Sequence, residues 1–192
     1  MAAYGIAVID VNKKLIILDQ LKADDHHDFV MMSWSIANLY KEFEDRYGWY
    51  IQKGALVAQE APISAGINAG KLNALGCYFY LRIGYFHEFK NIRTYHPIKL
   101  KSFHHKKSYK KQDTIEVVNK ILNIFENNGY NIKIAKSRLK KKLEITDGEA
   151  DAFMYAVTTF INNEDNELRN KILETYPRFE VVKSIEEVNY GL

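Results

Sequence analysis

The chain has 192 residues, of which 47% are hydrophobic and 27% are charged, a composition typical of one globular domain with a full core. Its single cysteine, Cys77, lies in an apolar stretch and excludes both a disulfide framework and a thiolate zinc cluster, as expected for the reducing cytosol. No segment approaches membrane-spanning length, and the N-terminus lacks the basic-then-apolar order of a secretion signal. The net charge of +3 is only mildly basic, so the distribution of charge is more informative than its sum.

Two β-rich runs open the chain, at residues 4–10 and 15–21. Between them lie four residues with Asn12 and Lys13 near their centre, a pattern that predicts a β-hairpin. A group of Asp and His residues follows at positions 24–28. Such groups can bind metal, but we interpret this one as the N-cap region of a helix predicted over residues 29–47 and ended by Gly48.

Residues 55–61 form a short apolar run that contains Glu60 near its end. A continuously apolar strand is typical of a central position covered on both faces of a sheet. Open α/β sheets place ligand and active-site groups at the carboxyl ends of such strands, which makes Glu60 a candidate site residue. The alternative is that Glu60 is a surface residue where a strand ends.

A helix is predicted over residues 72–85 and a strand over residues 91–95. The region from 91 to 112 contains no acidic residue and interleaves basic, aromatic and imidazole side chains. This pattern favours either a loop that follows nucleic-acid phosphates or a solvated lysine loop. The lysines that we single out as candidate nucleic-acid ligands are Lys99, Lys101, Lys106, Lys107, Lys110 and Lys111.

A further amphipathic helix is predicted over residues 115–125, and a second basic run extends from 133 to 142. The next helix has Thr146 or Asp147 as its N-cap and a buried apolar face from Ala152 to Phe160. Asp147 and Asp151 are four residues apart, so on a helix they point the same way and repel unless a cation lies near them. Acidic residues in a first turn also complement the helix dipole, which is the simpler interpretation.

The order of these elements, together with the strings LVAQEA, NAGKLNALGCYFYL, YHPIKLK and DGEADAFMYA, resembles the RuvC-type Holliday junction resolvases, and especially their phage and viral branch. The resemblance covers residues 2–160 and implies an α/β fold, an RNase H-like mixed sheet with flanking helices. It implies a resolvase domain over residues 1–163. The polar residues 164–192 indicate a C-terminal covering tail with one more helix.

By this resemblance, Glu60 and Asp151 correspond to metal-ligating carboxylates, and Asp147 or Glu149 to the remaining acid of the helix. The implied activity is hydrolysis of branched DNA with two Mg²⁺ ions, or Mn²⁺ in their place, by a homodimer in the cytoplasm of a bacterial host. The helices over residues 29–47 and 72–85 are the candidate dimer surfaces.

One departure from the family pattern concerns the first strand, which carries an essential Asp in the resolvases. Residues 2–10 match the second strand of the family, so the first strand and its Asp are missing, and we interpret Asp10 as a hairpin residue. The resemblance therefore predicts weak or absent cleavage by this chain unless the strand is supplied. The alternatives are a catalytically silent nucleic-acid-binding protein and an RNase H-like nuclease for RNA–DNA hybrids.

Overall fold

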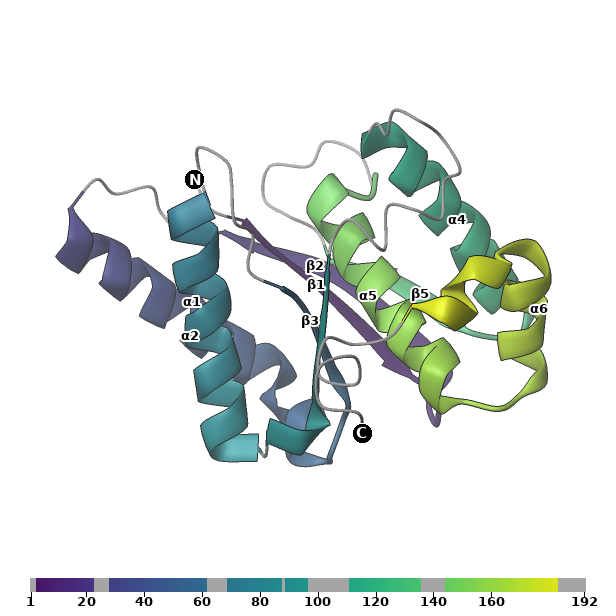
Figure 1. Cartoon of the computed structure of the whole chain (residues 1–192), viewed down its shortest axis with the longest axis horizontal. Helices are drawn as coiled ribbons and strands as arrows, with labels where there is room; N and C mark the ends of the chain where they lie inside the picture. The colour runs from purple at the N-terminus through teal and green to yellow at the C-terminus, as the bar shows by residue number, and fades with distance from the viewer. Residues whose placement is uncertain are drawn as a thin grey trace.

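The computed structural model describes residues 3–22, 28–61, 69–87, 89–96, 111–135 and 144–182. Figure 1 shows the helices on two sides of the strands, with α1 and α2 on one side and α4, α5 and α6 on the other. The elements in chain order are β1 (Ala3–Asp10), β2 (Leu15–Lys22), α1 (Phe29–Gln52), β3 (Val57–Glu60), α2 (Ala69–His87), η1 (Phe89–Asn91), β4 (Ile92–Tyr95), α4 (Lys111–Asn127), β5 (Asn131–Ile134), α5 (Asp147–Asn163), α6 (Glu167–Thr175) and η3 (Pro177–Val181).

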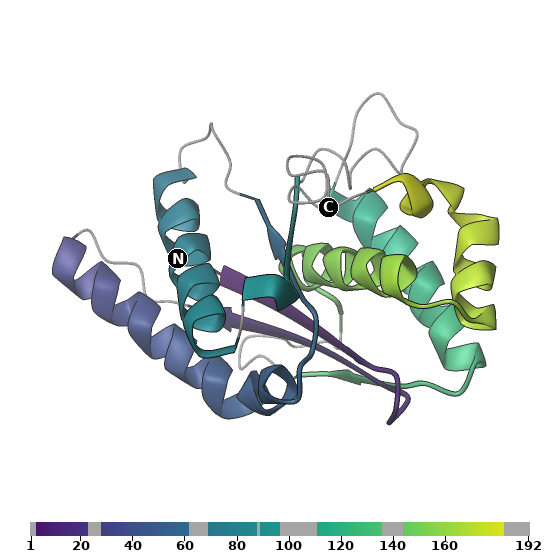
Figure 2. The same ribbon diagram turned by 60° about the horizontal axis from the view of Figure 1, so that its bottom comes forward.

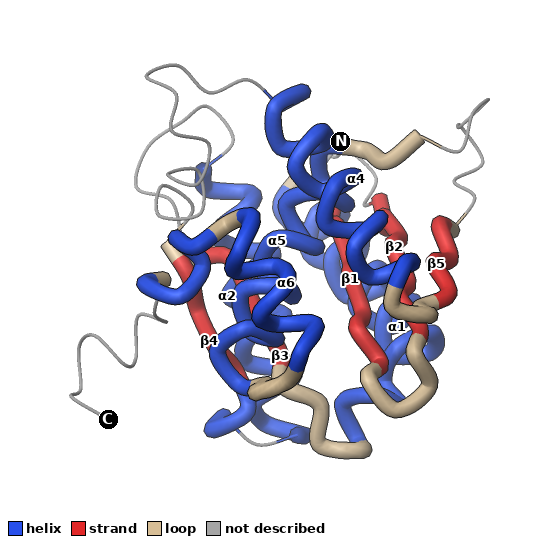
Figure 3. Tube along the Cα trace, turned by 90° about the vertical axis from the view of Figure 1, so that its right-hand side faces the viewer, coloured by secondary structure: helices blue, strands red, loops and turns tan. Residues whose placement is uncertain are grey.

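The described strands form two separate sheets (Figure 3). In the first sheet β1 pairs antiparallel with β2, and β2 pairs parallel with β5. In the second sheet β3 pairs parallel with β4 alone. The fold is therefore a mixed α/β fold, as the sequence predicts, but β3 has one strand neighbour in the described ranges rather than the predicted central position.

Alternation along β2 creates two hydrophobic cores, because successive side chains of a strand point to opposite faces. Ile16 and Leu18 are fully buried against α4, α5 and α6, whereas Ile17 and Leu21 pack in the core formed with α1 and α2. Figure 2 shows the long β1–β2 ribbon between these helix layers. Leu168 and Ile172 of α6, together with Phe179 and Val182, belong to the α5 core, so α6 is an integral part of that core.

The predicted hairpin is confirmed, with residues 11–14 forming its turn and the Asp10 carboxylate accepting a hydrogen bond from the Lys13 backbone N–H. The predicted end of α1 at Gly48 is wrong, since the helix continues to Gln52. A helical glycine costs only about 1 kcal/mol, and the buried side chains of Tyr47 and Ile51 compensate for it. The glycine that follows the helix end is Gly54, with φ of +80°.

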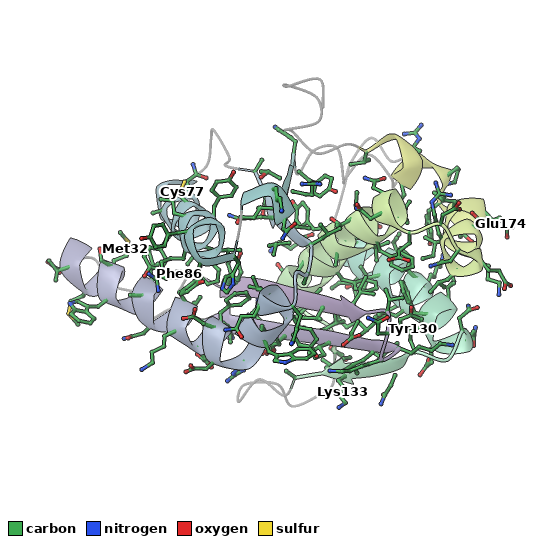
Figure 4. All side chains as sticks on the ribbon, turned by 90° about the horizontal axis from the view of Figure 1, so that it is seen from below. Met32, Cys77, Phe86, Tyr130, Lys133 and Glu174 are labelled. Carbon is green, nitrogen blue, oxygen red and sulfur yellow. The ribbon has the colours of Figure 1, made fainter. Side chains whose placement is uncertain are left out.

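Strand β5 was missed by the sequence analysis, which assigned Lys133 to the second basic run. The strand has only four residues, with Ile132 and Ile134 packed against the α5 core and Lys133 exposed between them (Figure 4). Two apolar residues are too few for a reliable periodicity. The other predicted helices and strands occur within a few residues of their predicted bounds, and no described helix is long and apolar enough to span a bilayer.

Candidate active site

Helix α5 begins directly against β1, at a contact between two glycines. A Cβ atom added to Gly5 would lie 1.9 Å from the Gly148 carbonyl oxygen, so only glycine permits this approach. Thr146 is the N-cap: its hydroxyl accepts a hydrogen bond from the Glu149 backbone N–H, and the Glu149 carboxylate accepts one from the Thr146 N–H at 2.7 Å. This reciprocal capping box fixes the first turn of α5 on the sheet.

The same helix also reaches the second sheet, where the Thr159 hydroxyl donates a hydrogen bond of 3.2 Å to the Tyr95 hydroxyl on β4. Helix α2 lies on the opposite face of the sheets from α5 and contacts both of them. The Gln59 side chain of β3 donates a hydrogen bond of 2.6 Å to the Gly76 carbonyl of α2. The Tyr4 ring of β1 stacks on Phe79 of α2, with ring centroids 4.1 Å apart. Helices α5 and α2 therefore hold β1 and β3 in place across a space between the sheets.

This space is a cavity of about 1290 Å³, which we call the inter-sheet slot. It is lined by residues 4–12 of the β1 region and residues 55–61 of the β3 region. Its α5 wall includes Gly148, Ala152 and Ala156, and its α2 wall includes Gly76 and Tyr80. The slot is thus walled by two strands and two helices, and most of these wall residues are small or apolar.

Three of the predicted acids line the slot, namely Glu60, Asp147 and Asp151. Alternation along β3 places Glu60 on the same sheet face as Ala58, which packs in the α5 core. Glu60 and the start of α5 both lie near the start of β1. Burial raises the pKa of Tyr4, with a smaller contribution from the charge of Glu60, and the next residue of β1 contacts the start of α5.

The carboxylate of Asp147 forms an ion pair with Lys111, the first residue of α4. Hydrogen bonding from Lys111 holds the pKa of Asp147 below its usual 3.8, and the same contact raises the pKa of Lys111, with a smaller contribution from Asp151. Sequence analysis assigned Lys111 to nucleic-acid binding and missed this pair. The two residues are 36 positions apart, so no local pattern connects them.

Glu149, the predicted alternative to Asp147 as metal ligand, is fully buried and its carboxylate accepts hydrogen bonds from the backbone and hydroxyl of Thr146. It does not line the slot. Asp147 is partly exposed and Asp151 is exposed, and both face the slot. This arrangement favours Asp147 over Glu149 as the helix acid that reaches a ligand.

The donor chemistry of Glu60, Asp147 and Asp151 suits Mg²⁺, a hard cation that prefers oxygen ligands and often takes only one or two carboxylates plus water. The Lys111 ammonium forms an ion pair with Asp147, so it competes with a metal ion for that carboxylate. However, no three His, Cys, Asp or Glu side chains of the described residues are grouped closely enough to hold a metal ion by themselves. The acids fit Mg²⁺ by type and by lining one cavity, but they are not grouped closely enough to hold an ion without water or another ligand.

The remaining candidates lie largely outside the described residues. These comprise Lys99, Lys101, Lys106, Lys107 and Lys110 of the first basic segment, and positions 24–27 of the Asp/His group. Asp28, the last of that group, is the N-cap of α1 and accepts a hydrogen bond of 3.0 Å from the Met31 N–H, as predicted.

No protein-family model, no curated protein sequence and no solved structure matches this chain. The functional argument therefore depends on the residues of the chain itself.

Proposed function

We propose that this protein is a metal-dependent, RNase H-like endonuclease of the RuvC type that acts on four-way DNA junctions. The single observation that carries the proposal is that Glu60 of β3 and Asp147 and Asp151 of α5, distant in sequence, line the same cavity. These are the acids that the resemblance to the resolvases selects, and the shared cavity supports the assignment.

In this proposal Glu60, Asp147 and Asp151 bind the divalent cations through their carboxylate oxygens. When bound, Mg²⁺ supplies Lewis-acid chemistry that activates water and stabilises the leaving oxygen of a phosphodiester. Lys111 forms an ion pair with Asp147 and balances part of its charge. The lysines from Lys99 to Lys110 would bind the DNA backbone through its phosphates, which gives an affinity that falls steeply with salt.

The test is a binding and cleavage assay on a synthetic four-way junction and on a linear duplex of the same sequence, with Mg²⁺ and with Mn²⁺. We expect selective binding of the junction and weak nicking, because the three acids are not grouped closely enough to hold a metal ion by themselves. Variants Glu60→Gln and Asp151→Asn should abolish the remaining nicking and keep the binding. Equal affinity for junction and duplex, or nicking that both variants retain, contradicts the proposal.

A second candidate is a catalytically silent protein that binds nucleic acid with the same fold. The observation that favours it is the ion pair between Lys111 and Asp147 together with the absence of a closed three-carboxylate group in the described residues. This candidate predicts junction binding without nicking under any metal. A preference for RNA–DNA hybrids over junctions would instead indicate the third candidate, an RNase H-like nuclease with another substrate.

We further propose that the protein acts as a homodimer, since two symmetric nicks require two active sites. Helices α1 and α2 expose large apolar side chains, a feature that supports a role in self-association. These side chains are Val30, Met31 and Trp34 on α1, and Leu81, Tyr85 and Phe86 on α2.

A further inference from the structure

The last turn of α1 carries two aromatic rings beside the hairpin turn. Trp49 and Tyr50 are neighbours in sequence, and their ring centroids lie 5.1 Å apart with the ring planes at 84°. The Nζ atom of Lys13, in the turn between β1 and β2, lies 4.1 Å from the centre of the Trp49 ring and 5.7 Å from that of Tyr50. An ammonium group therefore lies over the face of an indole ring, in a contact between two distant segments of the chain.

Trp49 remains 48% exposed in this arrangement. Tyr47 and Ile51, two residues before and after it, are buried in the α1–α2 core, whereas Trp49 packs in neither of the two cores that the described residues form. A single exposed apolar residue is common and has no functional meaning by itself. Here, however, the ring lines the inter-sheet slot and has a cation on one face, so its free surface adjoins both the cavity and a positive charge.

The local charge around this ring is positive. The hairpin turn (residues 11–14) and the segment 49–57 together contain three lysines and no acidic residue. Lys53 is exposed, lines the slot and has no acidic partner among the described residues. Lys13 has one, since the Asp10 carboxylate lies 3.7 Å from its Nζ atom, but more than half of the Lys13 side chain is exposed to solvent. We call Lys13, Trp49, Tyr50 and Lys53 the Trp49 corner.

A half-exposed aromatic ring beside ammonium groups has the chemistry that binds an unpaired nucleic-acid strand. Aromatic rings stack on nucleobases, all of which have a π face, and nearby cations attract the backbone phosphates. An acidic peptide would pair with the lysines and leave the ring without a partner, and an apolar peptide would cover the ring and leave the lysines. A base stacked inside a duplex has no free face, so the ligand must present an unstacked base.

The Trp49 corner is separate from the candidate cation site. Glu60 and the start of α5 lie near the start of β1, whereas Lys13 follows the end of that strand. Strand β1 has eight residues, which corresponds to about 23 Å between its first and last Cα atoms. Trp49 and Glu60 nevertheless line the same slot. A nucleic-acid strand that runs along the slot would therefore meet the acids and the Trp49 corner at different nucleotides.

We propose that the Trp49 corner is a stacking site for an unpaired nucleobase, with Lys13 and Lys53 attracting the phosphates of the same strand. The class of ligand, a nucleic acid, rests on the proposed function. The inference deepens that function, because it states which part of the branched substrate the protein binds here: a base that is unstacked from its duplex.

The test compares two ligands of equal charge. One is an oligonucleotide of six thymidines, and the other is an abasic chain of six deoxyribose phosphates. Binding is followed by tryptophan fluorescence in the Trp34→Phe variant, in which Trp49 is the remaining tryptophan of the chain. A chelator is present throughout, so no metal-dependent nicking takes place. The affinity of a labelled thymidine chain is measured in parallel, by fluorescence anisotropy, for Trp49→Leu, Trp49→Phe and the control Trp34→Leu.

We expect the thymidine chain to quench the emission of Trp49 and the abasic chain to leave it nearly unchanged, because only a stacked base contacts the indole ring. Trp49→Leu should weaken binding of the thymidine chain by about tenfold, the loss expected for one stacked base. Trp49→Phe should keep most of the affinity, since Phe also stacks. Trp34→Leu removes the other exposed tryptophan of α1 and should bind as wild type.

Equal quenching by the two chains, or no quenching by either, would overturn the proposal. Wild-type affinity in Trp49→Leu would also overturn it. If Trp49→Leu does not fold, the comparison of the two ligands in Trp34→Phe decides the question.

Failure of this inference is distinct from failure of the proposed function. Quenching by thymidines in a protein that does not nick junctions with Mg²⁺ would keep the stacking site and remove the nuclease activity. Nicking by a protein whose Trp49 does not respond to thymidines would keep the nuclease activity and remove the stacking site.

Discussion

The Tyr47 hydroxyl of α1 donates a hydrogen bond of 2.6 Å to the Asp19 carboxylate of β2. Arg46 donates a second hydrogen bond to the same carboxylate at 2.9 Å, and Asp19 is only 3% exposed. Burial raises the pKa of Tyr47, and the bond to Asp19 raises it further, so the hydroxyl keeps its proton. This polar group attaches α1 to the sheet within the otherwise apolar α1–α2 core.

Replacing Asp19 with Ala should destabilise the fold, because it leaves the buried Tyr47 hydroxyl without its acceptor. We expect a loss of about 2–3 kcal/mol in the free energy of unfolding, measured by urea denaturation. The control is Glu42→Ala, which removes the other, exposed carboxylate paired with Arg46 and should cost less than about 1 kcal/mol. Similar losses for the two variants would contradict the structural role of Asp19.

Replacing Gly5 with Ala should be more damaging, because the added methyl group meets the backbone of Gly148 rather than a flexible side chain. Separating α5 from β1 should cost about 3 kcal/mol or more of unfolding free energy. The control is Gly70→Ala in α2, where an added Cβ has no neighbour within 4 Å and should be neutral or slightly stabilising. Equal melting temperatures for the two variants would be incompatible with the described packing of α5.

Replacing Lys111 with Met tests the ion pair with Asp147. Lys111 holds the pKa of Asp147 below its usual 3.8, so the pair contributes stability above that pH and loses it as the pH falls through the lower pKa of the folded state. In the variant, the Asp147 pKa, followed by carboxyl NMR shifts, should rise and the acid-dependent loss of stability should shrink.

The same variant should bind Mn²⁺ more tightly, by about two- to fivefold at low salt, since the ammonium no longer competes for a partly exposed carboxylate. High salt should reduce the difference. An unchanged Asp147 pKa together with unchanged Mn²⁺ affinity would show that Lys111 does not occupy the cation position.

The local features of the site could be predicted from sequence because they depend on short patterns. An N-cap at Thr146 or Asp147, of which the structure shows Thr146, the same-face placement of Asp147 and Asp151, and Glu60 at the end of β3 each follow from a few neighbouring residues. The pairing of Lys111 with Asp147 and the contact of Gly5 with Gly148 could not be predicted, because each joins residues far apart in sequence.

Local sequence patterns also could not predict that the described strands form two separate sheets. An apolar run such as residues 55–61 predicts a strand covered by helices, and helices do cover it, but the run does not specify how many strand neighbours it has. The described sheets lie on either side of a cavity, which no local pattern indicates.

The exposed apolar side chains on α1 and α2 give a test of self-association. Trp34 is 63% exposed and Tyr85 is 80% exposed. If these helices form the dimer surface, Trp34→Glu or Tyr85→Glu should convert a dimer to a monomer at micromolar concentration, measured by light scattering after size-exclusion chromatography. The control is Asn170→Glu, at an exposed position of α6, which should leave the dimer intact. A monomeric wild-type protein, or variants that remain dimeric, would exclude this surface.

The most direct test of the central claim is Mn²⁺ binding, measured by loss of the free-ion electron paramagnetic resonance signal in wild type, Glu60→Gln and Asp151→Asn. The control is Glu126→Gln, an exposed glutamate of α4 that does not line the slot. We predict that each site variant weakens binding by roughly tenfold or more, since each removes one of few oxygen ligands, and that the control binds as wild type. If both site variants keep their melting temperatures and bind Mn²⁺ as tightly as wild type, Glu60 and Asp151 do not share a cation site.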